Sequence, residues 1–430
     1  MCDNLDYIFA PNYLQPIKTN IIMKLKNILF AALPLAALGI VSCSSDDDSS
    51  NNTNPTYTIP TEYVFERNGQ STVDFTGQTQ RLQMLAEFDA YSKNKAGFPT
   101  FDDTKVYNMF ANTSNPFGEN SLNTSGKQLR NKTAASVGYF STNSVEANAV
   151  KVAFDGLFTE MGDIAANYAT PATPGVAGSI EDGKRLINAK GLETNQAIIK
   201  GLMGACFLDQ AINNYLDITV LDETKAANDA GTVEEGKVYT TMEHKWDEAY
   251  GYIYGHRTTN TDGTPKMYFW ESYINTVNGN PHFAGIGTDI KNAFIKGRAA
   301  IVNKDYKTRD AQIKIIREKL SKIGAVRAVY YLEAGKALLS GDNAQTVKAF
   351  HGISEAFGFI TGLRYTNNPA TNAPYFTAIE VNAMQANLLG GTNGLWDANH
   401  TSAAIDQICG AIAQKYGFTI AEATAEGGSH

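Results

Sequence analysis

The sequence predicts an all-α protein built from two related helical bundles with long loops. Three observations lead to this prediction: apolar residues recur with a helical period, strand-like alternation is almost absent, and one helical stretch occurs twice. The chain has 430 residues with 43% hydrophobic content, which is enough apolar surface for a sizeable core. Its formal net charge of -8 and lack of Lys/Arg clusters argue against nucleic acid as a partner.

The N-terminal segment resembles a bacterial lipoprotein signal. From Met23, a basic start, an apolar middle and small residues lead to the string Ile-Val-Ser before Cys43. The apolar run is short for a spanning helix, although an uncleaved anchor is the alternative. We predict a signal peptide at 1–42, in which 1–22 reflects a mis-called start, and a lipid on Cys43 that holds the protein on the bilayer.

Residues 43–56 are polar and acidic and are expected to form a tether, since they cannot bury apolar surface. An acidic run directly after a lipidated cysteine resembles a surface-export signal. We therefore expect an outer-membrane lipoprotein, at the cell surface or on the periplasmic face.

The first bundle is expected at 57–256. It begins with an extended lead-in, because 57–75 has β-branched and aromatic residues without a helical period. Periodicity then predicts helices at 81–93, 144–168, 195–215 and 242–254. Pro, Asn, Ser and Gly predict a long loop with one or two short helical turns at 98–140, a turn at 171–178 and a polar loop at 220–240.

The second bundle is expected at 257–430. After a loop at 257–266, periodicity predicts helices at 289–303, 308–339, 346–360, 378–389 and 403–416. The aromatic stretch at 267–273 is interpreted as core, with a sugar-stacking surface as the alternative. Cys206 and Cys409 lie in apolar helical runs and are also interpreted as core, with a disulfide between them as the alternative.

The repeated stretch carries the same polar and glycine positions in both copies. The matched residues are His244, Glu248, Gly251 and Gly255 in the first copy, and His351, Glu355, Gly358 and Gly362 in the second. Each set lies on one helical stripe. A glycine inside a helix costs about 1 kcal/mol relative to alanine, so two on one stripe indicate close approach by another helix. We therefore expect both His/Glu pairs to point into helix packing.

Two such stripes can face one another across a pseudo-twofold axis, which would gather His244, Glu248, His351 and Glu355 in one interior. Imidazole and carboxylate ligands suit iron or zinc. Two other interpretations stay open. The pairs can be structural, pinning helices through buried hydrogen bonds, or they can line a polar small-molecule pocket between the bundles.

Peptidase chemistry is less favoured. The zinc-binding string His-Glu-x-x-His is absent, because each repeated helix offers a single imidazole. The Gly-x-Ser-x-Gly motif of a serine hydrolase is absent too. Without either arrangement, the sequence leans away from an enzyme.

The lipoprotein signal, the all-α pattern, the duplication and the His/Glu pair together resemble the imelysin-like proteins, also known as the insulin-cleaving membrane protease family. Three strings, Trp-Asp-Glu-Ala-Tyr-Gly from Trp246, Gly-Leu-Arg-Tyr from Gly362 and Gly-Thr-Asn-Gly-Leu-Trp from Gly391, are similar to an uncharacterised family of Gram-negative surface lipoproteins that is grouped near the imelysin-like proteins. The imelysin-like pattern is Gly-x-His-x-x-Glu, whereas Ala349 precedes His351 here and the carboxylate follows four residues later. The resemblance implies paired bundles and a link to iron uptake.

These observations predict an exported lipoprotein that acts as a binding or accessory component in iron or other metal acquisition, working with envelope transport partners. The alternative is a surface glycan- or peptide-binding lipoprotein with structural His/Glu pairs. A metallopeptidase-like enzyme is third.

Overall fold

A computed structural model describes residues 56–425 of the chain, apart from the side chain of Asn343. The predicted signal peptide at 1–42, Cys43 and nearly all of the predicted tether lie outside these residues. Between 56 and 425, no helix has both the length and the apolarity that crossing a bilayer requires.

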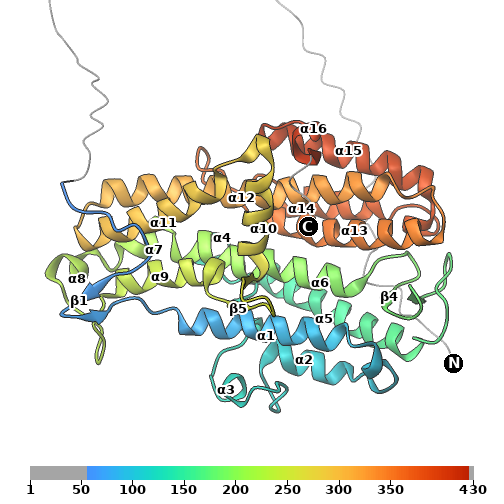
Figure 1. The fold of residues 1–430 in the computed structure, drawn as a ribbon, viewed down its shortest axis with the longest axis horizontal. Helices are drawn as coiled ribbons and strands as arrows, with labels where there is room; N and C mark the ends of the chain where they lie inside the picture. The colour runs from blue at the N-terminus through green and yellow to red at the C-terminus, as the bar shows by residue number, and fades with distance from the viewer. Residues whose placement is uncertain (1–55, 426–430) are drawn as a thin grey trace, which may run out of the picture. The chain divides into compact units, whose positions relative to one another are not determined.

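The all-α prediction is confirmed (Figure 1). The helices of the described part are α1 (Thr76–Ser92), η1 (Lys95–Thr100), α2 (Asp103–Ala111), α3 (Asn120–Asn123), η2 (Arg130–Lys132), α4 (Val137–Phe140), α5 (Ser144–Ala166), α6 (Thr194–Leu202), η3 (Met203–Leu208), η4 (Ala211–Tyr215), α7 (Ile218–Asp222), α8 (Lys225–Ala230), α9 (Thr241–Tyr254), α10 (Phe269–Gly279), η5 (Pro281–Phe283), α11 (Ile286–Val302), α12 (Tyr306–Lys336), α13 (Asn343–Gly362), η6 (Leu363–Tyr365), α14 (Ala378–Leu388), η7 (Gly394–Trp396), α15 (Ala398–Tyr416) and α16 (Ile420–Thr424).

Three short antiparallel hairpins connect some of these helices. They are β1 (Glu66–Arg67) with β2 (Gln70–Ser71), β3 (Gly178–Ile180) with β4 (Arg185–Ile187), and β5 (Arg257–Thr259) with β6 (Pro265–Met267). Their registers place Glu66 opposite Ser71, Gly178 opposite Ile187 and Arg257 opposite Met267. The β1–β2 hairpin turns at Asn68 and Gly69, both of which have a positive φ. Asn-Gly is a dipeptide that favours a two-residue hairpin turn, because both of its residues tolerate a positive φ.

Every long helix predicted from periodicity is present, and several begin at a capping box. Thr240 caps α9 with Glu243, Asp342 caps α13 with Gln345, and Thr377 caps α14 with the carboxylate three residues later. These reciprocal bonds satisfy backbone N–H groups that the first helical turn leaves free. They place the starts of both repeated helices within a few residues of the sequence prediction.

The sequence prediction was incomplete in the loops. The stretch 98–140 contains the nine-residue helix α2, whose end is fixed by Asn112 in a left-handed conformation. The Asn112 amide donates to the carbonyls of Leu122 and Lys127, so a side chain organises this region from within. The aromatic stretch at 267–273 leads into α10, where Trp270 and Tyr273 are buried, which supports its interpretation as core.

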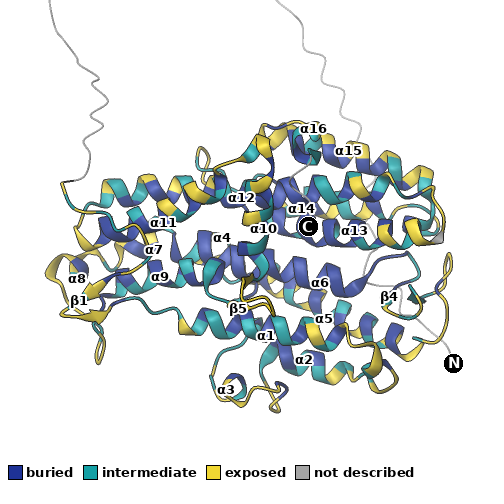
Figure 2. Cartoon of the chain, in the orientation of Figure 1, coloured by how far each residue is buried: buried dark blue, intermediate teal, exposed yellow. Residues whose placement is uncertain are grey.

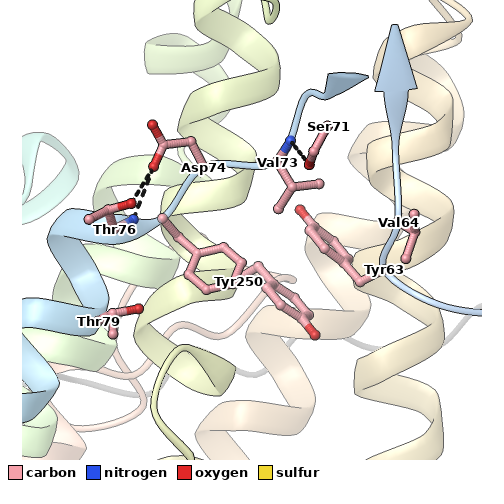
Figure 3. A pocket seen from close by; sticks show the side chains of 9 residues that line it. Tyr63, Val64, Ser71, Val73, Asp74, Thr76, Thr79 and Tyr250 are labelled. Atoms are coloured by element: carbon pink, nitrogen blue, oxygen red, sulfur yellow. Dashed lines mark hydrogen bonds between the residues drawn. The ribbon is translucent and has the colours of Figure 1, made fainter. Parts of the chain in front are cut away.

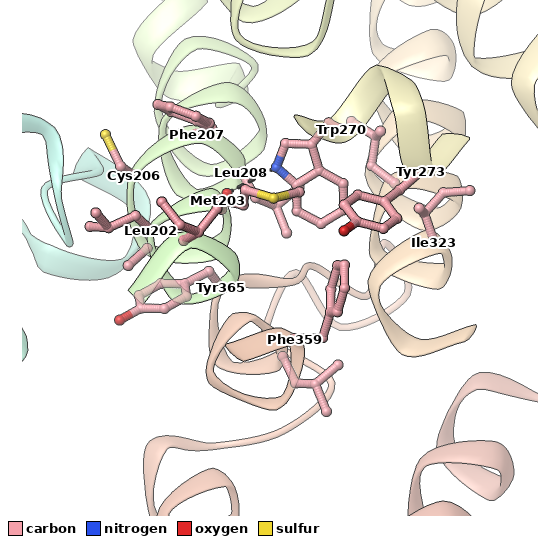
Figure 4. Close-up of a cluster of buried hydrophobic side chains, with 14 of the residues drawn as sticks. Leu202, Met203, Cys206, Phe207, Leu208, Trp270, Tyr273, Ile323, Phe359 and Tyr365 are labelled. Carbon is pink, nitrogen blue, oxygen red and sulfur yellow. Dashed lines mark hydrogen bonds between the residues drawn. The ribbon is translucent and has the colours of Figure 1, made fainter. Parts of the chain in front are cut away.

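The segment from α6 through η3 to η4 forms the centre of the molecule. Every residue from Gly191 to Asn213 is buried, and Figure 2 shows α6 dark along its length. Two parts of it, η3 and η4, are π-helical, a geometry that often accompanies functional or packing constraints. In Figure 4 the η3 side chains pack against Trp270, and the Trp270 indole donates to the Met203 carbonyl at 2.9 Å.

The glycine stripes do mark close helix approaches, as predicted. A Cβ on Gly358 would lie 2.4 Å from the Lys200 Cβ, and one on Gly204 would lie 2.4 Å from the Gly362 Cα, so α13 contacts the α6–η3 helix almost backbone to backbone. A Cβ on Gly251 of α9 would lie 2.4 Å from the Phe75 Cβ, at the start of α1. The two stripes therefore pack on different helices.

One hydrophobic core connects both halves of the chain. It runs from Leu82 to Ala423, and the described residues 56–425 belong to one compact unit. The predicted boundary at 256/257 falls in the short connection between α9 and β5. The division into pseudo-repeated bundles at 57–256 and 257–430 stays a prediction.

The Gly358 contact leads to a stability prediction. We expect Gly358→Ala to lower the free energy of unfolding by about 1–3 kcal/mol, because the overpacked Cβ outweighs a gain in helix propensity of about 1 kcal/mol. Gly410 in α15 is the matched control, since a Cβ there meets nothing within 4 Å. Urea unfolding should show that Gly410→Ala leaves the free energy of unfolding unchanged or raises it. Equal effects of the two substitutions would contradict the close contact.

Candidate functional site

The second predicted pair lies where α13 meets the start of α6. The Nδ1 atom of His351 is 2.7 Å from the Glu193 carboxylate and 2.7 Å from the Arg185 guanidinium. Glu193 is 4% exposed, so its charge needs these partners. His351 therefore joins α13 to the residue that precedes α6.

Glu355 forms a buried ion pair one turn further along α13. It is 7% exposed, and its carboxylate lies 2.9 Å from the Lys200 ammonium of α6. Burial alone would raise the pKa of Glu355, but the Lys200 charge, followed by His351, lowers this pKa to about 2. Lys200 also donates to Gln196 at 3.0 Å. Both members of the second pair thus bond to the central helix, as a structural pair would.

The first pair has different surroundings. The His244 ring stacks on Tyr239, with centroids 4.6 Å apart and planes 15° from parallel. Its Nδ1 atom is buried and has no hydrogen-bond partner among the described residues. Glu248 accepts a bond of 2.8 Å from the Gln78 amide of α1. Both side chains line one hollow of the surface.

This hollow, which we name the α1/α9 cavity, has a volume of about 450 Å³. The residues that line it are Asp74, Thr76, Gly77, Gln78, Gln80, Arg81, Lys127, Lys132, Tyr215, Glu234, Lys237, Tyr239, His244 and Glu248. Burial, followed by the negative charge of Glu248, raises the pKa of the Tyr215 phenol, which places these two groups close together. The first pair therefore faces a polar cavity rather than a packed helix.

The structure does not bring the two pairs together. His351 lies beside Glu193, at the start of the central helix, whereas Glu248 lies beside Tyr215, at its end. Twenty-two residues of helix at about 1.5 Å each separate these points by about 30 Å. The expected common interior of His244, Glu248, His351 and Glu355 is thus wrong. The physical reason is that the repeat encodes a similar face but not the helix that this face meets.

The metal prediction has no assembled ligand set in the described part of the chain. Between residues 56 and 425, no group of three or more His, Cys, Asp or Glu side chains has a geometry that could hold a metal ion. Each His/Glu pair supplies two ligands at one place. Iron or zinc as a cofactor stays a prediction.

A second cavity of about 440 Å³ lies beside the first and shares Asp74 and Thr76 with it (Figure 3). It has an aromatic wall, because the Tyr63 and Tyr250 rings stack with centroids 3.7 Å apart. The Tyr63 hydroxyl donates to the buried Asp247 at 2.6 Å, which fixes this ring in place.

Residues 60–419 match a family described as "Domain of unknown function (DUF4856)". The chain belongs to this family. Comparisons with curated proteins and with solved structures gave no match. The resemblance to imelysin-like proteins therefore stays a prediction, and the site of this DUF4856 chain has to be argued from its own residues.

Both remaining cysteines of the DUF4856 region are core residues. Cys206 and Cys409 are buried and free, so the alternative of a disulfide between them is wrong. Burial raises the pKa of the Cys206 thiol to about 12, which keeps it protonated.

The sequence interpretation missed the cavity walls contributed by α1 and by the loop after α3. Arg81, Lys127 and Lys132 line the cavity, yet no motif connects them with His244. One signal was available: residues 127–132 hold three basic side chains within six positions of an acidic chain. Of these, Arg130 pairs with Asp155, and the two lysines are left facing the cavity.

The Lys200–Glu355 pair predicts a pH dependence. Because the folded pKa of Glu355 is about 2 and its usual value is 4.5, its stabilisation is present above pH 4.5 and is lost as the pH falls towards 2. We expect Glu355→Gln to cost about 3–5 kcal/mol at neutral pH, because Lys200 would be left buried without a counter-charge. The difference in the free energy of unfolding between wild type and variant, measured by urea unfolding, should become smaller as the pH is lowered from 6 to 3.

The exposed Glu318→Gln is the matched control for that titration and should follow the wild type at each pH. A gap between wild type and Glu355→Gln that stays constant with pH would contradict the ion pair.

Proposed function

We propose that this DUF4856 chain is an exported lipoprotein that binds a small polar ligand in the α1/α9 cavity. The observation that carries this proposal is that His244 and Glu248 line one polar cavity, and that the buried Nδ1 of His244 has no hydrogen-bond partner among the described residues. A buried polar atom left unsatisfied costs about 1–3 kcal/mol, so a site that retains one is suited to a ligand or water that completes it. The cavity volume falls within the range of small-molecule sites.

The contrast between the two pairs supports the proposal. The Nδ1 of His351 lies against Glu193 and Arg185, and the Glu355 carboxylate pairs with Lys200, so these groups have protein partners. His244 and Glu248 come from the same sequence pattern, but they line a cavity, and the Nδ1 of His244 has no partner among the described residues. We assign binding to the first pair and helix anchoring to the second.

Export rests on the N-terminal sequence pattern that ends at Cys43. A lipid on Cys43 would hold the domain at the outer membrane, on the cell surface or the periplasmic face, where envelope transport partners would take its ligand. Acquisition of iron or another metal, as in the imelysin-like proteins, is the narrower form of this proposal.

Glycan binding is the second candidate function. The stacked Tyr63 and Tyr250 rings of the neighbouring cavity favour it, because aromatic faces with adjacent polar groups such as Asp74 suit the apolar and hydroxyl surfaces of a sugar. A glycan could contact both cavities across their shared residues.

A ligand panel tests the proposal. We expect at least one class among neutral sugars, amino acids, organic acids, Fe(III) and Zn(II) to raise the melting temperature of the wild type. A ligand present at 100 times its Kd stabilises by about 2.7 kcal/mol. The effect should weaken in Glu248→Gln, because the ligand loses a charged acceptor, and should persist in the exposed control Glu318→Gln. A panel that never distinguishes these two variants would reject the α1/α9 cavity as the site.

A further inference from the structure

One wall of the α1/α9 cavity gathers three cationic side chains. Arg81 comes from α1, Lys127 from the loop that follows α3, and Lys132 from the end of η2. A Cβ placed on Gly77 would lie 3.5 Å from the Lys127 Nζ and 3.6 Å from the Arg81 Nη1, so these two cationic groups are close to one another. Burial, followed by the Arg81 charge, lowers the pKa of Lys132, and the nearby charge of Glu248 opposes this shift, so the Lys132 amine lies close to both groups.

None of the three forms an ion pair with a carboxylate of residues 56–425. Arg81 is 5% exposed and donates to the carbonyls of Gln128 and Gly77. Lys132 donates to the Tyr215 hydroxyl at 3.0 Å. Two like charges 4 Å apart repel by about 4 kcal/mol at an effective dielectric constant of 20, so such a cluster favours an anion between its members.

A purely structural role explains only part of this cluster. The two carbonyl bonds of Arg81 hold the loop against α1, which accounts for its burial. The Lys127 ammonium has no hydrogen bond to the described chain, and the only hydrogen bond of the Lys132 ammonium there is to the neutral Tyr215 hydroxyl, with the Glu248 charge nearby. Both ammonium groups nevertheless point to a half-buried cavity wall in a chain of net charge -8, in which carboxylates outnumber cations.

We infer that the ligand of the α1/α9 cavity carries an oxyanion, a phosphate or a carboxylate, which Arg81, Lys127 and Lys132 bind. This inference rests on the proposed function and narrows the ligand class. Phosphate and carboxylate oxygens accept several charge-assisted hydrogen bonds at once, which suits a guanidinium next to two ammonium groups. Glu248 and His244, which also line the cavity, then contact the polar remainder of the ligand.

The test compares the wild type with the double variant Lys127→Gln/Lys132→Gln. Arg81 is kept, because its carbonyl bonds support the fold. The control is Lys314→Gln, an exposed lysine of α12. The probes are inorganic phosphate, acetate and the neutral molecule glycerol, each measured against sodium chloride at equal ionic strength.

Phosphate, acetate or both should raise the melting temperature of the wild type and of Lys314→Gln, and this shift should be lost in the double variant. The anion with the larger shift identifies phosphate or carboxylate chemistry. In peptide mass spectrometry the same anion should slow acetylation of Lys127 and Lys132 about twofold at a concentration equal to its Kd, because half of the sites are then occupied. Acetylation of Lys314 should not change.

Three results overturn the inference: no anion effect in the wild type, an equal anion effect in the double variant, or an equal effect of glycerol. If a neutral ligand of the panel still binds and weakens in Glu248→Gln, the proposed function stands while the anion inference fails. Absence of binding by every neutral and charged probe overturns both.

Discussion

The constraint on which the structure depends is the burial of a helix that carries polar side chains. From Thr194 to Asn213 this central helix has no solvent-facing side, so its charged groups are paired inside the protein, whereas the Thr194 hydroxyl and the Gln210 amide have no partner among the described residues. Lys200 takes Glu355 of α13, and Asp209 accepts from Ser136. Asn213 donates to the Tyr365 carbonyl, and these contacts fix what surrounds the helix.

This arrangement explains why two similar sequence stripes have different roles. The stripe of α13 packs its glycines on the central helix, and His351 and Glu355 complete the partners of Glu193 and Lys200. The stripe of α9 packs Gly251 on α1 instead. Where α1 begins, the walls separate enough to leave a polar cavity. A repeated pattern thus anchors a helix in one place and lines a polar cavity in another.

Much of the fold follows from the sequence, because the helical period of apolar residues and the free-energy cost of a glycine inside a helix are local properties. The long helices and the tight approach at Gly358 could be predicted in this way. Which helix each stripe meets could not, because that choice depends on long-range packing of α1 and α6. The cavity was missed for the same reason: Arg81 and Lys132 are distant in sequence from His244, and only the folded chain brings them to one wall.

Pulsed electron paramagnetic resonance tests the central claim most directly. Spin labels on cysteines introduced at Lys245, next to His244, and at Lys348, one helical turn before His351, measure the separation of the pairs once the four native cysteines are replaced. The central helix predicts a distance of about 30 Å or more. Facing stripes on two packed helices would give a distance below about 20 Å, since helix axes in contact are 8–10 Å apart, and that result would contradict separate roles for the two pairs.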